Sequence, residues 1–123
     1  APILHVNHIL PKLMPVKVSQ IERHPHATQC FFPLDVSRYL VMVMPSNAAG
    51  QPCPDQTLGF LMPGTVGVTF FPGVWHMGAT VLDRTGHFIV LMWRSGDEKD
   101  DDFRKITPIT LVNTNQTANG ILS

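Results

Sequence analysis

Histidine side chains at two places in the sequence have the types and spacing needed for proton transfer or metal binding. His24 and His26 lie two residues apart, and His76 lies much later in the chain. Residues two apart on a strand face the same side, and Pro25 favours an extended conformation in the residue before it. We therefore expect His24 and His26 to point into one cavity, where His76 can join them.

The three histidines suit two kinds of chemistry, and their presence can also be explained without a function. A histidine titrates near neutral pH, so a pair such as His24 and His76 suits general acid–base catalysis. Three imidazoles, from His24, His26 and His76, also suit a divalent metal such as zinc, nickel, iron or manganese, with Gln29 as a weak neutral ligand. The plainer alternative leaves His24 and His26 on the surface and has His76 donate to a backbone carbonyl.

Proline and glycine determine which elements can position these residues. The 123 residues include 11 Pro and 9 Gly, and inside a helix each Pro costs about 3 kcal/mol and each Gly about 1 kcal/mol. Long helices are therefore nearly excluded, and many short strands are predicted, as in an antiparallel sandwich or barrel. The predicted strands are 3–9, 16–21, 28–34, 39–44, 58–62, 66–71, 79–82 and 87–93.

Two of these strands and one turn have distinctive patterns. The segments 28–34 and 39–44 are apolar almost throughout, so we expect both strands to be buried on both faces. Residues 83–86 read Asp-Arg-Thr-Gly, which predicts a hairpin turn between the strands on either side.

The C-terminal part contains an acidic run, residues 97–102, with five acids and one base. We predict that this run begins a short solvated helix or a loop, and that 108–112 returns as an edge strand. The expected organisation is a single domain over residues 1–112 followed by a polar tail, 113–123.

Charge and composition exclude some classes of partner. The net charge is zero, which argues against a nucleic-acid or anionic-membrane binder. Outside the acidic run, however, bases exceed acids by about four, which suits a small anionic metabolite. The apolar run 88–93 is far shorter than the roughly 20 residues of a membrane helix. No targeting segment is visible, and Cys30 and Cys53 have no metal or disulfide spacing, so we expect a cytoplasmic protein.

Longer segments around the histidines resemble a known family. Residues 23–33 read Arg-His-Pro-His-Ala-Thr-Gln-Cys-Phe-Phe-Pro, and Val-Trp-His follows at 74–76. Together they resemble the ureidoglycolate lyase family over roughly residues 3–95. The resemblance implies an all-β, cupin-like antiparallel barrel (jelly roll) that is usually a homodimer. It also implies an enzyme of purine breakdown, a lyase that breaks a C–N bond to split ureidoglycolate into glyoxylate and urea.

The resemblance also implies roles for individual residues, with no cofactor required. His24 and His76 would form the acid–base pair, and Gln29 would hydrogen-bond the ureido or carbonyl group. An arginine would hold the substrate carboxylate, although on a regular strand Arg23 would point away from the neighbouring His24. The residues that would contact the substrate are Arg23, Arg94 and Trp75.

Differences from the family keep other functions open. Met77 and His87 stand where the family has a histidine and an aspartate. One alternative is a metal-dependent cupin enzyme in which His24, His26 and His76 hold a divalent ion and act on a different small anionic substrate. The other is a cupin that binds a small molecule without catalysis.

Overall fold

The computed structural model describes residues 2–93 and 100–113. This part of the chain is almost entirely β-strand, with a single 3-10 turn, so the all-β prediction is confirmed. The elements are β1 (Pro2–Ile9), β2 (Val16–Arg23), β3 (Gln29–Pro33), β4 (Arg38–Met44), η1 (Pro54–Gln56), β5 (Leu58–Pro63), β6 (Val68–Phe70), β7 (Trp75–His76), β8 (Thr80–Leu82), β9 (Gly86–Trp93) and β10 (Asp102–Leu111).

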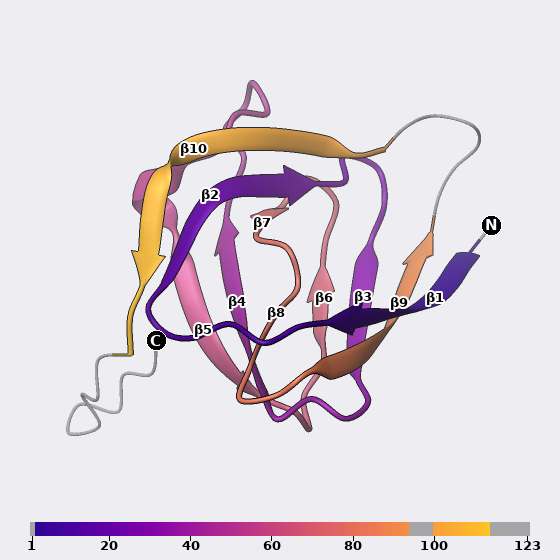
Figure 1. Ribbon diagram of the computed structural model, residues 1–123. Coiled ribbons are helices and arrows are strands. Elements are labelled where there is room, and N and C mark those ends of the chain that lie inside the picture. Colours follow the sequence, from indigo (N-terminus) through magenta and orange to yellow (C-terminus); the bar gives the residue numbers. More distant parts are fainter. Residues whose placement is uncertain (1, 94–99, 114–123) are drawn as a thin grey trace.

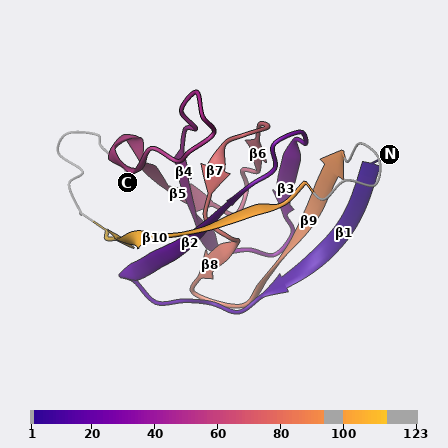
Figure 2. The same cartoon turned by 90° about the horizontal axis from the view of Figure 1, so that it is seen from above.

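The strands form two antiparallel sheets (Figures 1 and 2). One has the order β1-β9-β3-β6, and the other has the order β10-β2-β7-β4-β5 with β8 also paired to β4. Within the described residues neither sheet closes on itself. The arrangement is consistent with the cupin-like sandwich or barrel that the sequence predicts. No helix in the described ranges has the length and apolar character needed to cross a bilayer.

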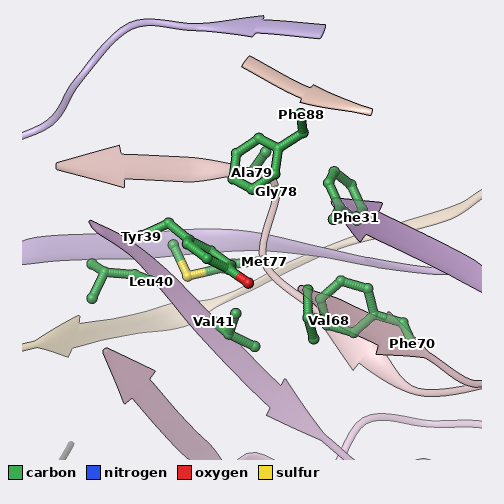
Figure 3. A pocket seen from close by; sticks show the side chains of 10 residues that line it. All are labelled: Phe31, Tyr39, Leu40, Val41, Val68, Phe70, Met77, Gly78, Ala79 and Phe88. Atoms are coloured by element: carbon green, nitrogen blue, oxygen red, sulfur yellow. The ribbon is translucent and has the colours of Figure 1, made fainter. Parts of the chain in front are cut away.

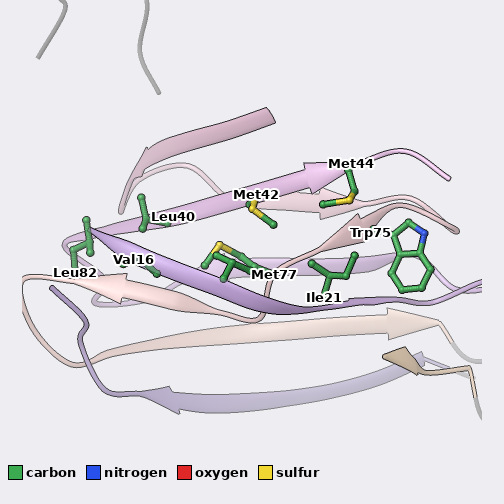
Figure 4. Packing of buried hydrophobic residues seen from close by; sticks show 9 residues of the cluster. Val16, Ile21, Leu40, Met42, Met44, Trp75, Met77 and Leu82 are labelled. Carbon is green, nitrogen blue, oxygen red and sulfur yellow. The ribbon is translucent and has the colours of Figure 1, made fainter. Parts of the chain in front are cut away.

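Two apolar clusters hold the sheets together. In β4, Leu40, Met42 and Met44 belong to the first cluster, which the curved second sheet encloses together with Trp75 (Figure 4). The alternate residues of β4 belong to the second cluster, which lies between the two sheets. Because successive side chains of a strand point to opposite faces, β4 is buried on both faces, as predicted from its apolar sequence.

Three local predictions are wrong. The strand β3 is buried on one face only, since Phe32 is 45% exposed. Residues 83–86 do not form a hairpin: β8 pairs with β4 in one sheet, while β9 pairs with β1 and β3 in the other. Asp83 takes the positive φ of 69° at this crossing, and its carboxylate bonds Arg38 and Ser37.

The third correction concerns the acidic run, whereas the edge strand predicted at 108–112 is present as the last part of β10. β10 begins at Asp102, inside the run, and continues through residues 108–111 along the edge of the second sheet. Asp100 is only 6% exposed, so this part of the run is not a solvated segment. Residues 97–99 and the tail 114–123 lie outside the described part of the chain.

Candidate active site

An irregularity in β2 decides which side chains face the site. Val16, Val18 and Ile21 all pack in the first cluster, so the interval between buried residues changes from two to three. Ser19 and Gln20 are consequently both exposed, and the pairing of β10 with β2 shifts at the same level. At this shift β10 advances by four residues, from Lys105 to Ile109, while β2 advances by two, from Gln20 to Val18. The changed interval within β2 places Ile21 on the face of the first cluster and Glu22 on the opposite face.

The strand β7 brings the second histidine beside the end of β2. His76 pairs with Glu22 of β2 on one side and with Val43 of β4 on the other. The turn before β7 contains Gly73, whose φ is 81° and whose N–H donates to the carbonyl of His24 at 3.0 Å. This bond joins the two segments that carry the family motifs.

His76 is a buried, neutral imidazole with one free nitrogen. It is 1% exposed and stacks on Phe70 with ring centroids 4.0 Å apart. Its Nδ1 donates to the carbonyl of Val74 at 3.0 Å, so Nε2 carries the lone pair. Among the described residues Nε2 has no hydrogen-bond partner, and Oε1 of Glu22 lies 3.8 Å away. Burial lowers the pKa of His76 to about 4, so the ring is a base at neutral pH.

His24, unlike His76, has hydrogen-bond partners at both ring nitrogens. Its Nδ1 lies 2.9 Å from the carbonyl oxygen of Asp100 and 3.1 Å from a carboxylate oxygen of Asp101. Its Nε2 lies 3.1 Å from Oε1 of Gln29. Because these oxygens accept hydrogen bonds, the arrangement suits a ring that donates from both nitrogens, which is the charged imidazolium. The rings of His24 and His76 have centroids 5.6 Å apart.

Glu22 completes the cluster. Burial raises its pKa, although the nearby charge of His24 opposes this shift and Asp101 adds to it. One ligand atom each from Glu22, His24 and His76 lie within 4.8 Å of one another. The cluster therefore offers two imidazoles and a carboxylate, a set that can move protons or hold a divalent cation.

The structure brings together three of the predicted site residues, His24, Gln29 and His76, and separates them from Arg23 and Trp75. Trp75 precedes His76 in β7, so it faces the other side of the sheet. There the Arg23 guanidinium lies 4.9 Å from the Trp75 ring and its Nε donates to Asp102 at 3.1 Å. The fully buried Trp75 thus packs in the first cluster beside Arg23 (Figure 4).

A further predicted residue, His26, lies outside this cluster. The side chain of His26 is exposed, and its backbone N–H donates to both carboxylate oxygens of Asp100, at 3.0 and 3.2 Å. The residue that could hold a metal together with His24 and His76 is Glu22, whereas the sequence predicts His26. Arg94 lies outside the described residues.

Sequence reasoning missed Glu22 and the aspartates at 100 and 101. Glu22 lies two residues before His24, the same spacing that drew attention to His26, so alternation was a usable signal. The aspartates had no such signal, because their contact with His24 joins residues far apart in the chain. The plainer explanation of the histidines holds in part, since His76 does donate to a carbonyl.

Comparison with known proteins agrees with the resemblance seen in the sequence. The family model described as ureidoglycolate lyase matches residues 1–112. The ureidoglycolate lyase of Burkholderia cepacia is 40% identical over 91 residues, which cover 73% of this chain and 50% of that protein. That of Schizosaccharomyces pombe is 34% identical over 89 residues, covering 69% and 47%. That of Burkholderia mallei is 33% identical over 99 residues, covering 80% and 56%. The chain thus spans about half the length of these relatives.

Proposed function

The chain belongs to the ureidoglycolate lyase family, and we propose that it cleaves ureidoglycolate into glyoxylate and urea. The observation that carries the proposal is the pairing of a neutral His76 with a doubly hydrogen-bonded His24, their rings 5.6 Å apart, beside Glu22. His76, held neutral by burial, and His24, hydrogen-bonded at both ring nitrogens, are the two imidazoles that this acid–base reaction needs.

Ureidoglycolate carries a hydroxyl and a ureido nitrogen on the same carbon, next to its carboxylate. A base removes the hydroxyl proton, and the electrons of the O–H bond form the C=O bond of glyoxylate. The C–N bond breaks with its electron pair leaving on nitrogen, and an acid protonates that nitrogen to release urea. The atoms balance without water or a redox partner.

The geometry suggests how the roles divide. The side chain of Glu22 is 22% exposed whereas that of His76 is 1% exposed, so the carboxylate is the group that substrate reaches. Glu22 takes the hydroxyl proton and keeps it, because its pKa is raised while that of His76 is lowered, and the free Nε2 of His76 accepts a hydrogen bond from the protonated carboxyl group. His24, which the two aspartates hold in place, protonates the leaving nitrogen, and Gln29 orients both His24 and the ureido group.

The carboxylate of the substrate needs a cationic partner. Arg23 is paired with Asp102 on the far face of the sheet, so Arg94 stays the predicted arginine for this role.

The proposed reaction is tested by incubating the purified protein with ureidoglycolate and measuring glyoxylate and urea. Release of both in equal amounts supports the proposal, and no release by the wild type contradicts it.

A second candidate is the metal-dependent enzyme, because Glu22, His24 and His76 form a ligand set of two imidazoles and one carboxylate. The residues fit such an ion once Nε2 of His24 gives up its proton and its bond to Gln29; Nδ1 of His76 already donates to a backbone carbonyl, which leaves its Nε2 to face the site. A bound divalent ion would polarise an oxygen of the substrate.

We expect any metal bound here to depend on Glu22 and not on His26. Elemental analysis should show the bound ion lost in Glu22→Gln and retained in the matched surface variant His26→Ala. Turnover that persists after chelation favours metal-free acid–base chemistry. An ion that Glu22→Gln leaves in place would contradict this ligand set.

The proposal includes a homodimer, supported by the outer face of the first sheet. Its strands present Leu4 (66% exposed), Phe32 (45%) and Trp93 (51%) together with the half-buried Leu91. Strand spacing gives this sheet a footprint of roughly 400 Å², the size of patch that marks an interaction surface. This face, within the described strands, contains no Lys, Arg, Asp or Glu. A second copy can therefore pack on it without bringing like charges together.

Leu4→Lys is expected to convert the dimer to a monomer, because the dimer would bury a charge on each side of the interface. Sedimentation velocity measures the change. Lys17→Leu, at an exposed position of β2, is the control and should leave the mass unchanged. A wild-type monomer, or a Leu4→Lys protein that stays dimeric, would exclude this interface.

We also assign the reaction to purine breakdown in the cytoplasm. Both cysteines, Cys30 and Cys53, are free thiols, and this supports a reducing compartment.

A further inference from the structure

Gly78, two residues after His76, lines three hollows of the molecule. One is a small apolar cavity between the sheets, where Gly78 lies beside Met77 and Ala79 (Figure 3). The other two adjoin along the polar face of β2, and both are lined by Gln20 and Gly78. We call these two hollows the β2 groove.

The β2 groove connects cationic side chains to the proposed site. Lys12 and Lys17 line one of its hollows, of about 200 Å³, and Glu22 lines the other, of about 220 Å³. Neither lysine forms an ion pair with an acid within residues 2–93 and 100–113, so their charges are available to an anion.

The glycine at the junction keeps this path open. A Cβ at Gly78 would meet no heavy atom within 4 Å, and the φ of Gly78 lies outside the left-handed region. Backbone conformation and packing therefore do not require glycine here. A larger side chain would project into free space, at the point where the hollows join.

We propose that the β2 groove binds small carboxylates and leads them to Glu22, and that Gly78 sets the size of ligand that can pass. The proposal rests on the proposed function for the place of the chemistry. Lys17 lies five residues before Glu22, roughly 16 Å along a strand, too far for one small acid to touch both. The lysines therefore attract the anion, and Gln20 holds it at the junction.

The test uses N-carbamoylglycine, which has the carboxylate and ureido groups of ureidoglycolate but no hydroxyl and so cannot be cleaved. Its binding is measured by calorimetry, independently of turnover. Gly78→Leu should weaken binding by about tenfold or more, and Gly78→Ala by a smaller factor. Thermal unfolding of Gly78→Ala should match that of the wild type, because a Cβ at this position meets no heavy atom within 4 Å, and Gly78→Leu is used for binding only if its unfolding midpoint is also unchanged.

The lysines are tested through salt dependence. Lys17→Met should weaken binding by roughly two- to threefold at low ionic strength, and the difference should vanish at high salt because exposed charges are screened. Arg84→Met is the matched control: it removes one positive charge at the β8–β9 connection, where Arg84 donates to the carbonyl of Asp35. It should leave binding unchanged.

The outcomes separate this proposal from the proposed reaction. Binding that Gly78→Leu abolishes, in a protein without lyase turnover, supports the groove and refutes the reaction. A folded Gly78→Leu protein that binds N-carbamoylglycine as tightly as the wild type overturns the groove, even if the wild type cleaves ureidoglycolate. A wild type that does not bind N-carbamoylglycine overturns it as well.

Discussion

Glutamine in place of His76 will lower the kcat for ureidoglycolate cleavage by about 10²- to 10⁴-fold, the usual contribution of a positioned acid or base. His76 is the neutral imidazole of the cluster, with its free Nε2 directed at Glu22. The glutamine amide can occupy much of the same volume but lacks the ring nitrogen whose lone pair faces Glu22 and holds its proton in place. KM should change far less than kcat, because the buried ring does not bind the substrate.

The control for this variant is His26→Gln, the same chemical change at an exposed histidine two residues from His24. It should retain nearly full kcat. Both proteins need an unfolding midpoint close to that of the wild type, since His76 stacks on Phe70 and its loss can also loosen the core. A stable His76→Gln protein with wild-type kcat would remove His76 from the mechanism.

Acid will destabilise the fold through the same side chain. Burial lowers the pKa of His76 to about 4 in the folded protein, from its ordinary value of 6.5. Between these two pH values the unfolded chain binds more protons than the folded one, so the free energy of unfolding rises with pH. The contribution of His76 is fully present above pH 6.5 and is lost as the pH falls through 4. This difference between the two pKa values corresponds to about 3 kcal/mol in the free energy of unfolding.

Glu22 has the opposite effect on the free energy of unfolding, over a pH range that overlaps that of His76. Its pKa is raised above 4.5 in the folded protein, so there the folded state binds the extra proton and gains stability as the pH falls. The wild type should therefore lose less than about 3 kcal/mol between pH 6.5 and 4. Asp35 and Asp83, whose pKa values are lowered from 3.8, contribute only at lower pH.

Denaturant unfolding of three proteins at pH 6.5 and pH 4 measures these effects. Glu22→Gln should show the steepest loss, because it removes the compensating proton. His76→Gln should show the smallest loss. Equal pH dependence in the wild type and His76→Gln would mean that His76 is not a buried neutral base.

The short-range part of the site was predictable from the sequence. His24, Gln29 and His76 lie in motifs whose residue order is recognisable without a structure, and Pro72 and Gly73 mark the turn that brings them together. The structure adds the bond from the Gly73 N–H to the His24 carbonyl. The preference of Pro and Gly for turns and against helices likewise made the all-β architecture predictable.

The faces of the strands were not predictable in the same way. A strand alternates its side chains with period two, so one extra residue exchanges the two faces for all that follow. The shift at Ser19 and Gln20 gives Ile21 and Arg23 one face and Glu22 the other. Nothing in the local sequence says whether such a shift occurs, because it depends on the pairing of β2 with β10.

The cluster around the two histidines also shows which properties of the site the sequence alone does not determine. By itself it determined the β-rich fold, the family and the two histidines, because these depend on local conformational preference and on motifs. Only the tertiary structure decided that Glu22 joins them, that Arg23 and His26 do not, and that the acidic run reaches His24 through Asp100 and Asp101. The physical reason is that burial and hydrogen bonding between distant segments set the charge of each group.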